Sequence, residues 1–183
     1  VGQKIQGKLG MRGSNTAELV FENCKVPAKY LVGEEGHSMI HMMRNLELER
    51  LTLAAQSVGI ARRCIDVMVK YAKEREAFGK SLDSFGQIQK YIADSYAEYM
   101  ASKTYVYATA QNMSLDKEGN RIDSDGVKLV ATTMGKNVAD RAIQVLGGYG
   151  YVAEYVVERL WRDTKPKKIT TKTTEKHQKK NTK

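Results

Sequence analysis

The chain has 183 residues, two cysteines and a formal net charge of +9 at pH 7. Its hydrophobic share of 42% is typical of a globular protein with a sizeable core, and no apolar run is long enough to span a bilayer. Cys24 and Cys64 form no C-x-x-C pair, so we expect two reduced structural thiols rather than a disulfide framework or a zinc site. The opening "VGQKIQGKLGMRGSNT" contains neither a signal segment nor an arginine-rich leader, so either no targeting segment exists or the natural start is missing.

Most of the positive charge lies at the C-terminal end. Residues 164–183 contain eight lysines and one glutamate. Such a tail can attract nucleic acid or an anionic membrane without specificity, but no aromatic residue interrupts it for base stacking. We therefore interpret it as a solvated charge run and expect neither a nucleic-acid partner nor a membrane partner.

The N-terminal residues differ in pattern from the rest. "TAELVFENCKVP" alternates between polar and apolar residues and is bounded by Gly, Asn and Pro, which predicts a strand near the edge of a sheet. An isolated strand or hairpin is marginal in water, so this strand needs partners.

From about residue 36 to residue 151, apolar residues recur at three- and four-residue spacing, which predicts long helices. We expect helices at about 38–74, 84–113 and 124–146, the second capped by Ser84, and a short fourth helix over "EYVVERLWRD". Long helices with short connections bury their apolar stripes against one another. The predicted fold class is mainly α, an antiparallel four-helix bundle.

The first predicted helix contains "LELERLTLAA", residues 46–55, with two glutamates among leucines. At helical spacing Glu47 lies between Arg44 and Arg50, which is typical of a solvated charged stripe. Glu49 has leucines but no basic residue at those offsets. Burial among leucines would raise the pKa of this carboxyl toward that of a general base, whereas a position at the stripe edge would leave it in solvent. Helix geometry leaves both interpretations open.

Two other stretches are candidates for a binding site. "GGYGY", residues 147–151, follows a helix and lacks the Rossmann pattern, so it indicates either a helix-ending turn or a place where a ligand approaches the backbone closely. In "KEREAFGKSLDSFGQIQ", Arg75 offers a guanidinium suited to phosphate. A C-capping turn explains Gly79 but does not explain an exposed Phe78. The three histidines are too scattered for a metal site, and no nucleophilic triad is present.

Several stretches in series resemble one enzyme family. "LGMRGSNTAELVFENCKVP", "LELERLTLAA", "REAFGKSLDSFGQIQ", "IQVLGGYGY" and "RLWRDTK" resemble the acyl-CoA dehydrogenases, most nearly their isovaleryl-CoA branch, over the chain to about residue 165. The resemblance implies that residues 1–33 are the C-terminal strands of a middle β domain. It implies that residues 34–183 are the C-terminal helical bundle with a basic tail.

The resemblance also implies partners and a cellular setting. These are an FAD cofactor, a short branched-chain acyl-CoA substrate of leucine catabolism, a homotetramer built as a dimer of dimers, and an electron-transferring flavoprotein as electron acceptor. The location would be the mitochondrial matrix in a eukaryote or the cytoplasm in a bacterium. The family's N-terminal helical domain and most of its β domain are absent from these residues, so we expect little turnover from this piece alone.

The family removes the α proton of an acyl-CoA thioester with a carboxylate while the flavin accepts the β hydride. Most branches carry this base late in the chain, where Thr171 stands here. The isovaleryl-like branch carries it at the glutamate of an Asp-Leu-Glu-Arg motif, which matches Glu49. The resemblance therefore implies that Glu49 is the base, with Glu47, Arg50 and Thr171 on the substrate side.

The resemblance also assigns the cofactor contacts. Arg75 would face the FAD pyrophosphate, and the turn at 144–148 would meet FAD across a subunit boundary. The full implied set is Arg75, Phe78, Gln87, Gln144, Gly147, Gly148, Thr173 and Glu175. The departures from the family pattern are Ile40 in place of a substrate-side tyrosine, Gly86 in place of a glutamine, and Pro166 and Lys172 in the C-terminal segment.

Two other functions remain open. A non-catalytic bundle that oligomerises or binds acyl-CoA would fit the missing domains and the divergent C-terminal segment. Nucleic-acid binding through the lysine tail has only charge to support it.

Overall fold

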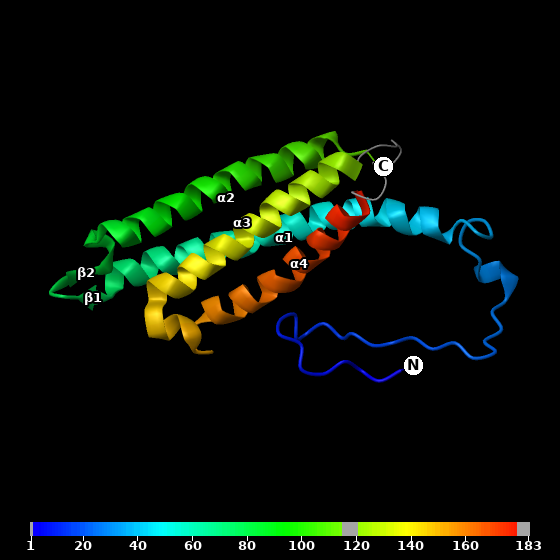
Figure 1. Cartoon of the computed structure of the whole chain (residues 1–183), viewed down its shortest axis with the longest axis horizontal. Helices are drawn as coiled ribbons and strands as arrows, with labels where there is room; N and C mark the ends of the chain where they lie inside the picture. Colours follow the sequence, from blue (N-terminus) through cyan, green and yellow to red (C-terminus); the bar gives the residue numbers. More distant parts are fainter. Residues whose placement is uncertain (1, 115–120, 179–183) are drawn as a thin grey trace.

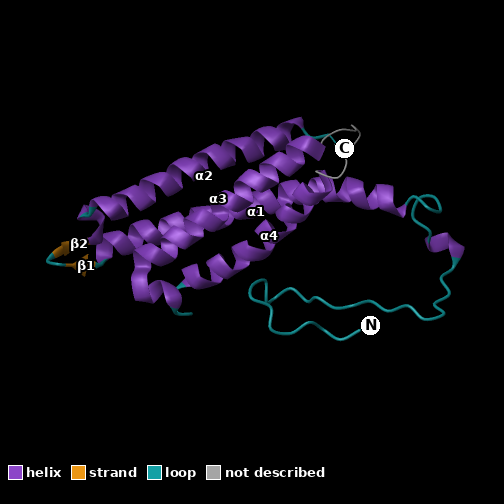
Figure 2. Cartoon of the chain, in the orientation of Figure 1, coloured by secondary structure: helices purple, strands orange, loops and turns teal. Residues whose placement is uncertain are grey.

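The computed structural model describes residues 2–114 and 121–178, and side-chain surroundings are described for residues 2–114 and 122–167. The chain folds mainly into helices, with one small hairpin (Figure 2). In order, the elements are η1 (Ala28–Tyr30), α1 (Ser38–Glu74), β1 (Glu76–Ala77), β2 (Lys80–Ser81), η2 (Leu82–Ser84), α2 (Gly86–Asn112), α3 (Arg121–Leu146), η3 (Gly147–Tyr151) and α4 (Val156–Gln178).

The four long helices run alternately in opposite directions, and α3 packs against each of the other three (Figure 1). This confirms the predicted antiparallel four-helix bundle. The hairpin lies at the end where α1 meets α2, and α1 extends at its N-terminal end beyond the other helices (Figure 1). Within the part of the chain that the structure describes, no helix is long and apolar enough to cross a membrane.

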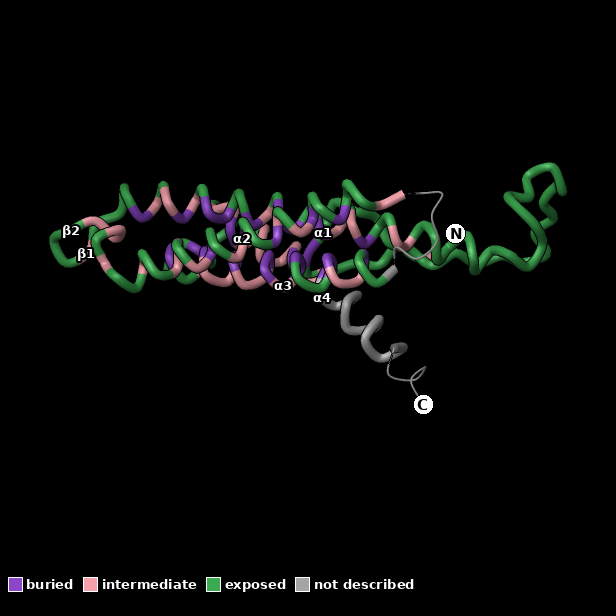
Figure 3. The backbone as a smooth tube through the Cα atoms, turned by 90° about the horizontal axis from the view of Figure 1, so that it is seen from above, coloured by how far each residue is buried: buried purple, intermediate pink, exposed green. Residues whose placement is uncertain are grey.

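The core follows directly from the apolar periodicity of α1. Its buried residues recur every three or four positions, which aligns them on one face of the helix. Many are alanines, and their small side chains allow the neighbouring helices to approach closely. Figure 3 shows the buried positions where the helices overlap, whereas the N-terminal segment is exposed. The buried apolar residues of α1 are Ala54, Val58, Ala61, Cys64, Ile65, Met68 and Ala72.

The two thiols lie in opposite environments, which leads to a first prediction. Cys64 is fully buried, and loss of water raises the pKa of its thiol to about 12, whereas Cys24 is exposed. Because the thiolate is the reactive species, we expect Cys24 alone to react with a disulfide reagent at mildly alkaline pH. A thiol count of the native and the unfolded protein measures this, and rapid reaction of both thiols in the native protein would contradict it.

The N-terminal segment forms no continuous strand. Lys4 and Ala17 form an isolated antiparallel bridge, and the backbone N–H groups of Gly2 and Ile5 donate to carbonyls near Ala17. The strand predicted over residues 16–27 is therefore wrong beyond this bridge. The physical reason is the lack of partner strands among the described residues, because an edge strand is not stable alone.

Two predicted helix boundaries also need correction. Ser84 does not cap α2, because the helix begins at Gly86 after Phe85, and the Ser84 hydroxyl donates instead to the carbonyl of Ser81 at 2.6 Å. The fourth helix is much longer than predicted and runs through Pro166. A proline inside a helix removes one hydrogen bond, to the carbonyl of Arg162, but the rest of the helix continues.

Candidate functional site

The buried Arg50 anchors α1 to α3. Its Nε lies 2.8 Å from Oδ1 of Asp125, and both side chains are largely shielded from solvent. Lys128, one turn further along α3, is also buried, and its pKa is lowered by burial and by the nearby Arg50 charge, an effect that Asp125 partly offsets. Arg50 was predicted to lie close to the substrate. That position stays a prediction, and the structure shows that the Arg50 guanidinium forms an interhelical ion pair, which the sequence did not reveal.

The two candidate carboxylates on α1 differ in their exposure. Helix geometry left two interpretations of Glu49 open, and its exposure agrees with the one that leaves it in solvent, whereas Glu47, expected on the solvated stripe, is half-buried. Among the described residues, no apolar wall encloses the Glu49 side chain.

At the other end of α1, three of the predicted cofactor residues come together. Arg75, Gly147 and Gly148 line one cavity of about 570 Å³. Arg75 ends α1, with its backbone N–H donating to the carbonyl of Tyr71, and its guanidinium lies 5.7 Å from the centre of the Tyr149 ring. The resemblance implied only that each of these residues contacts the cofactor. The fold shows in addition that they line the same cavity.

An aromatic cluster, of which Tyr71 and Tyr149 line this cavity, was missed at the sequence level. The rings of Tyr71 and Tyr149 lie 6.4 Å apart, and Tyr155 lies 6.2 Å from Tyr71 and 5.4 Å from Tyr149. Burial raises the pKa of Tyr71, although the charge of Arg75 opposes the shift. The only sequence signal was the four-residue spacing of Tyr71 and Arg75, which places both on one helix face.

The cavity walls fit the diphosphate of FAD. Gly147 has φ +59, a left-handed conformation that favours glycine, and a Cβ added at either Gly147 or Gly148 would meet nothing within 4 Å. No side chain therefore covers the backbone on the open side of the turn, so a ligand can approach the backbone there. Arg75 supplies a fork of donors that matches phosphate oxygens, while Glu154, also in the lining, is the one acidic residue there.

Phe78 lies outside this cavity, at the tip of the β1–β2 hairpin. Both residues of its turn, Phe78 at φ 53 and Gly79 at φ 78, have left-handed backbone, as in tight hairpin turns. The Phe78 side chain is 96% exposed and contacts the ring of Phe85, whose centre lies 6.3 Å away. A bulky exposed aromatic residue in a strained turn is costly, which favours contact with another molecule.

Two further predicted cofactor residues do not line this cavity, since Gln87 and Gln144 are exposed on α2 and α3. Thr173 and Glu175 of the predicted cofactor set, and Thr171 of the predicted substrate set, fall in the part of α4 whose side chains lie outside the described residues. Their predicted contacts stay predictions. Within the described residues, no group of histidine, cysteine or acidic side chains could hold a metal ion.

The fold and the site define a class of protein, a helical bundle with a carboxylate near one end and an arginine–glycine cavity at the other. The chain belongs to the acyl-CoA dehydrogenase family, whose C-terminal domain model matches residues 38–179.

Two relatives and one solved structure illustrate the match. The mitochondrial isovaleryl-CoA dehydrogenase of Oryza sativa subsp. japonica is 47% identical over 89% of this chain and 39% of its own length. The mitochondrial 2-methylacyl-CoA dehydrogenase of Solanum tuberosum is 45% identical over 94% and 42%. The structure of butyryl-CoA dehydrogenase from Megasphaera elsdenii superimposes with a TM-score of 0.87 at 38% identity, covering 93% of this chain and 44% of that one. The chain thus spans less than half the length of these relatives.

Proposed function

We propose that these residues form the C-terminal part of a longer FAD-dependent dehydrogenase that oxidises a short branched-chain acyl-CoA. The main observation behind this proposal is the cavity lined by Arg75 and by the η3 glycines. A guanidinium beside exposed backbone suits a diphosphate cofactor. Family membership supports the reaction class. The branched substrate is supported by two relatives, whose names specify isovaleryl-CoA and 2-methylacyl-CoA.

In the proposed reaction Glu49 takes the α proton of the thioester. FAD, when bound, accepts the β hydride. The neighbouring Arg50, held by Asp125 at 2.8 Å, fixes the rotation of α1 and therefore the direction in which Glu49 projects. Glu49 is exposed in this chain, so the apolar wall that would tune its basicity belongs to the rest of the enzyme. The exposed Phe21 and Val32 in the N-terminal segment support a covering domain of this kind.

The distance between the two ends of α1 supports a multi-subunit site. At about 1.5 Å per residue, the helix from Glu49 to Arg75 is about 39 Å long. The ring and the diphosphate of one FAD are joined by a short ribityl chain that cannot span this length. We therefore assign the Glu49 and Arg75 of one chain to two different flavins, with a second copy completing each, as a homotetramer allows.

Glycine substitutions at the cavity provide the test. Because Gly148 has open space around it, Gly148→Val should leave folding unchanged but fill the surface where FAD approaches, lowering flavin affinity at least about tenfold. Arg75→Ala should do the same by removing the fork of donors. Gly59→Val, at an exposed helix position with equally open space, is the matched control.

Flavin content and affinity can be measured by visible absorption and fluorescence titration. Equal flavin affinity in Gly148→Val, Arg75→Ala and Gly59→Val would contradict the assigned cofactor site. A protein that binds no flavin would instead favour the second candidate, a non-catalytic bundle that oligomerises or binds acyl-CoA. In the catalytic case, we expect an electron-transferring flavoprotein to reoxidise the cofactor, in the mitochondrial matrix of a eukaryote or the cytoplasm of a bacterium.

A further inference from the structure

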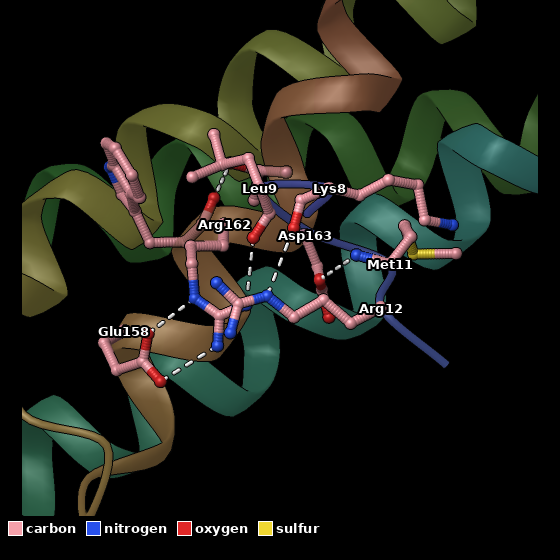
Figure 4. A network of polar contacts seen from close by, with 9 residues as sticks. Lys8, Leu9, Met11, Arg12, Glu158, Arg162 and Asp163 are labelled. Atoms are coloured by element: carbon pink, nitrogen blue, oxygen red, sulfur yellow. Dashed lines mark hydrogen bonds and ion pairs between the residues drawn. The ribbon is translucent and has the colours of Figure 1, made fainter. Parts of the chain in front are cut away.

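The N-terminal segment is held to the bundle by its backbone at one point. Residues 2–37 are almost entirely exposed, but Gly10 is buried. Figure 4 shows this place, where the chain at Leu9 and Met11 lies against α4. The Met11 N–H donates to Oδ1 of Asp163 at 2.7 Å, and Nη1 of Arg162 donates to the carbonyl of Leu9 at 3.0 Å. These two bonds join residues more than 150 positions apart in the chain.

Within α4 itself, an ion pair with Glu158 holds the Arg162 side chain in place. Glu158, one turn earlier on α4, accepts two hydrogen bonds from the Arg162 guanidinium, at 2.7 and 3.0 Å (Figure 4). The same contact lowers the pKa of Glu158 and raises that of Arg162. Such a bidentate pair holds the guanidinium in one orientation, so its remaining Nη1 donor points at the Leu9 carbonyl without further ordering.

Only glycine fits between the two hydrogen bonds. A Cβ on Gly10 would lie 2.4 Å from the carbonyl oxygen of Arg162 and 2.9 Å from Oδ1 of Asp163. Pro166 follows Arg162 by four residues and has no N–H, so it cannot form the usual helical bond to that carbonyl. The segment therefore packs against the stretch of α4 where the helix ladder is interrupted. Met11 takes φ 50, a left-handed conformation that is unfavourable for a side chain of this size.

The contact lies next to the cofactor end of the bundle. Leu9, Gly150, Trp161 and Arg162 line a second cavity, of about 700 Å³, between the segment, η3 and α4. The indole N–H of Trp161 donates to Asp140 of α3. The η3 turn thus has the N-terminal segment on one side, while its glycines Gly147 and Gly148 line the Arg75 cavity.

We propose that Arg162 and Asp163 are positioning residues that bind the backbone of residues 9–11 and fix the region preceding the bundle against the η3 end. This rests on the proposed function, in which these residues belong to a longer enzyme whose other parts complete the active site. Both hydrogen bonds are made to backbone groups, so the contact requires Gly10 but no particular side chain at Leu9 or Met11. Its effect on FAD is indirect, through the relative placement of two parts of the site.

The test uses two pairs of variants in the flavin-loaded protein. Asp163→Ala removes the acceptor for the Met11 N–H, whereas Asp163→Asn keeps a carbonyl oxygen there. Gly10→Ala introduces the clash with Arg162, whereas Gly13→Ala, in the same loop, meets nothing within 4 Å. Helical content by circular dichroism should be the same in all four variants, because the contact lies outside the buried core.

Two readouts decide the proposal. We expect Asp163→Ala and Gly10→Ala to accelerate amide hydrogen exchange at Met11 about tenfold and to weaken flavin affinity by a similar factor, while Asp163→Asn and Gly13→Ala change neither. Unchanged exchange in Asp163→Ala, or a flavin affinity lowered equally by Gly13→Ala, would overturn the positioning role. Accelerated exchange with unchanged flavin affinity would also overturn it. A wild-type protein that binds no flavin would contradict the proposed function, while the exchange measurement would still test the contact.

Discussion

Replacement of Glu49 by glutamine should abolish most of the dehydrogenation without changing the fold. Glutamine has the same size but cannot accept the α proton, and removal of a general base lowers a rate by about 10²- to 10⁴-fold. Because Glu49 is exposed on α1, the substitution removes no core contact. The rate of flavin reduction after anaerobic mixing with isovaleryl-CoA measures the proton-abstraction step directly.

The matched control is Asp66→Asn, the same carboxylate-to-amide change at an exposed position further along α1. Among the described residues, Asp66 pairs with Arg62 on the helix surface, at 3.0 Å, and it lies outside both proposed sites. Flavin content and melting temperature should match the wild type in both variants. If Glu49→Gln reduced the flavin as fast as Asp66→Asn does, Glu49 would not be the base.

The second large effect is expected at the buried ion pair of Arg50 and Asp125. Asp125→Ala would leave Arg50 and Lys128, two cations, buried without the carboxylate that compensates them. Breaking a buried pair in this way costs about 3–5 kcal/mol. Urea unfolding followed by helical circular dichroism measures the change in free energy of unfolding at neutral pH.

Two comparisons separate this effect from a general loss of charge. Removal of the exposed Arg62–Asp66 pair by Asp66→Ala should leave the free energy of unfolding nearly unchanged, because solvent screens the pair. Replacement of both Arg50 and Asp125 by methionine should recover most of the stability lost in Asp125→Ala, since no uncompensated charge then remains at that pair. A cost for Asp125→Ala as small as that for Asp66→Ala would show that the pair does not anchor α1 to α3.

The helices of the core were predictable because their signals are local. In α1 the buried Ala54, Ala61, Ile65 and Met68 recur at the spacing of one helix face, and the predicted bounds 38–74 agree with Ser38–Glu74. Three long amphipathic stretches with short connections then leave few arrangements other than an antiparallel bundle. The arginine and glycine signals near residues 75 and 147 were also local, although only the fold shows that they share a cavity.

The features that were missed depend on contacts between distant residues. The Arg50–Asp125 pair joins α1 to α3, and no pattern within either helix indicates its partner. The fourth helix was predicted only over "EYVVERLWRD", whereas α4 continues through Pro166 to Gln178. Glu49 is exposed although the next residue, Arg50, is buried, and the spacing of the leucines alone could not decide between the two interpretations of Glu49.

One measurement tests the central claim most directly, namely the visible absorption spectrum of the purified longer enzyme that contains these residues, before and after anaerobic addition of isovaleryl-CoA. The proposed function predicts a flavin band that is bleached by the substrate in the wild type and that persists in Glu49→Gln. A protein without a flavin band, or a Glu49→Gln variant bleached as fast as the wild type, would contradict it.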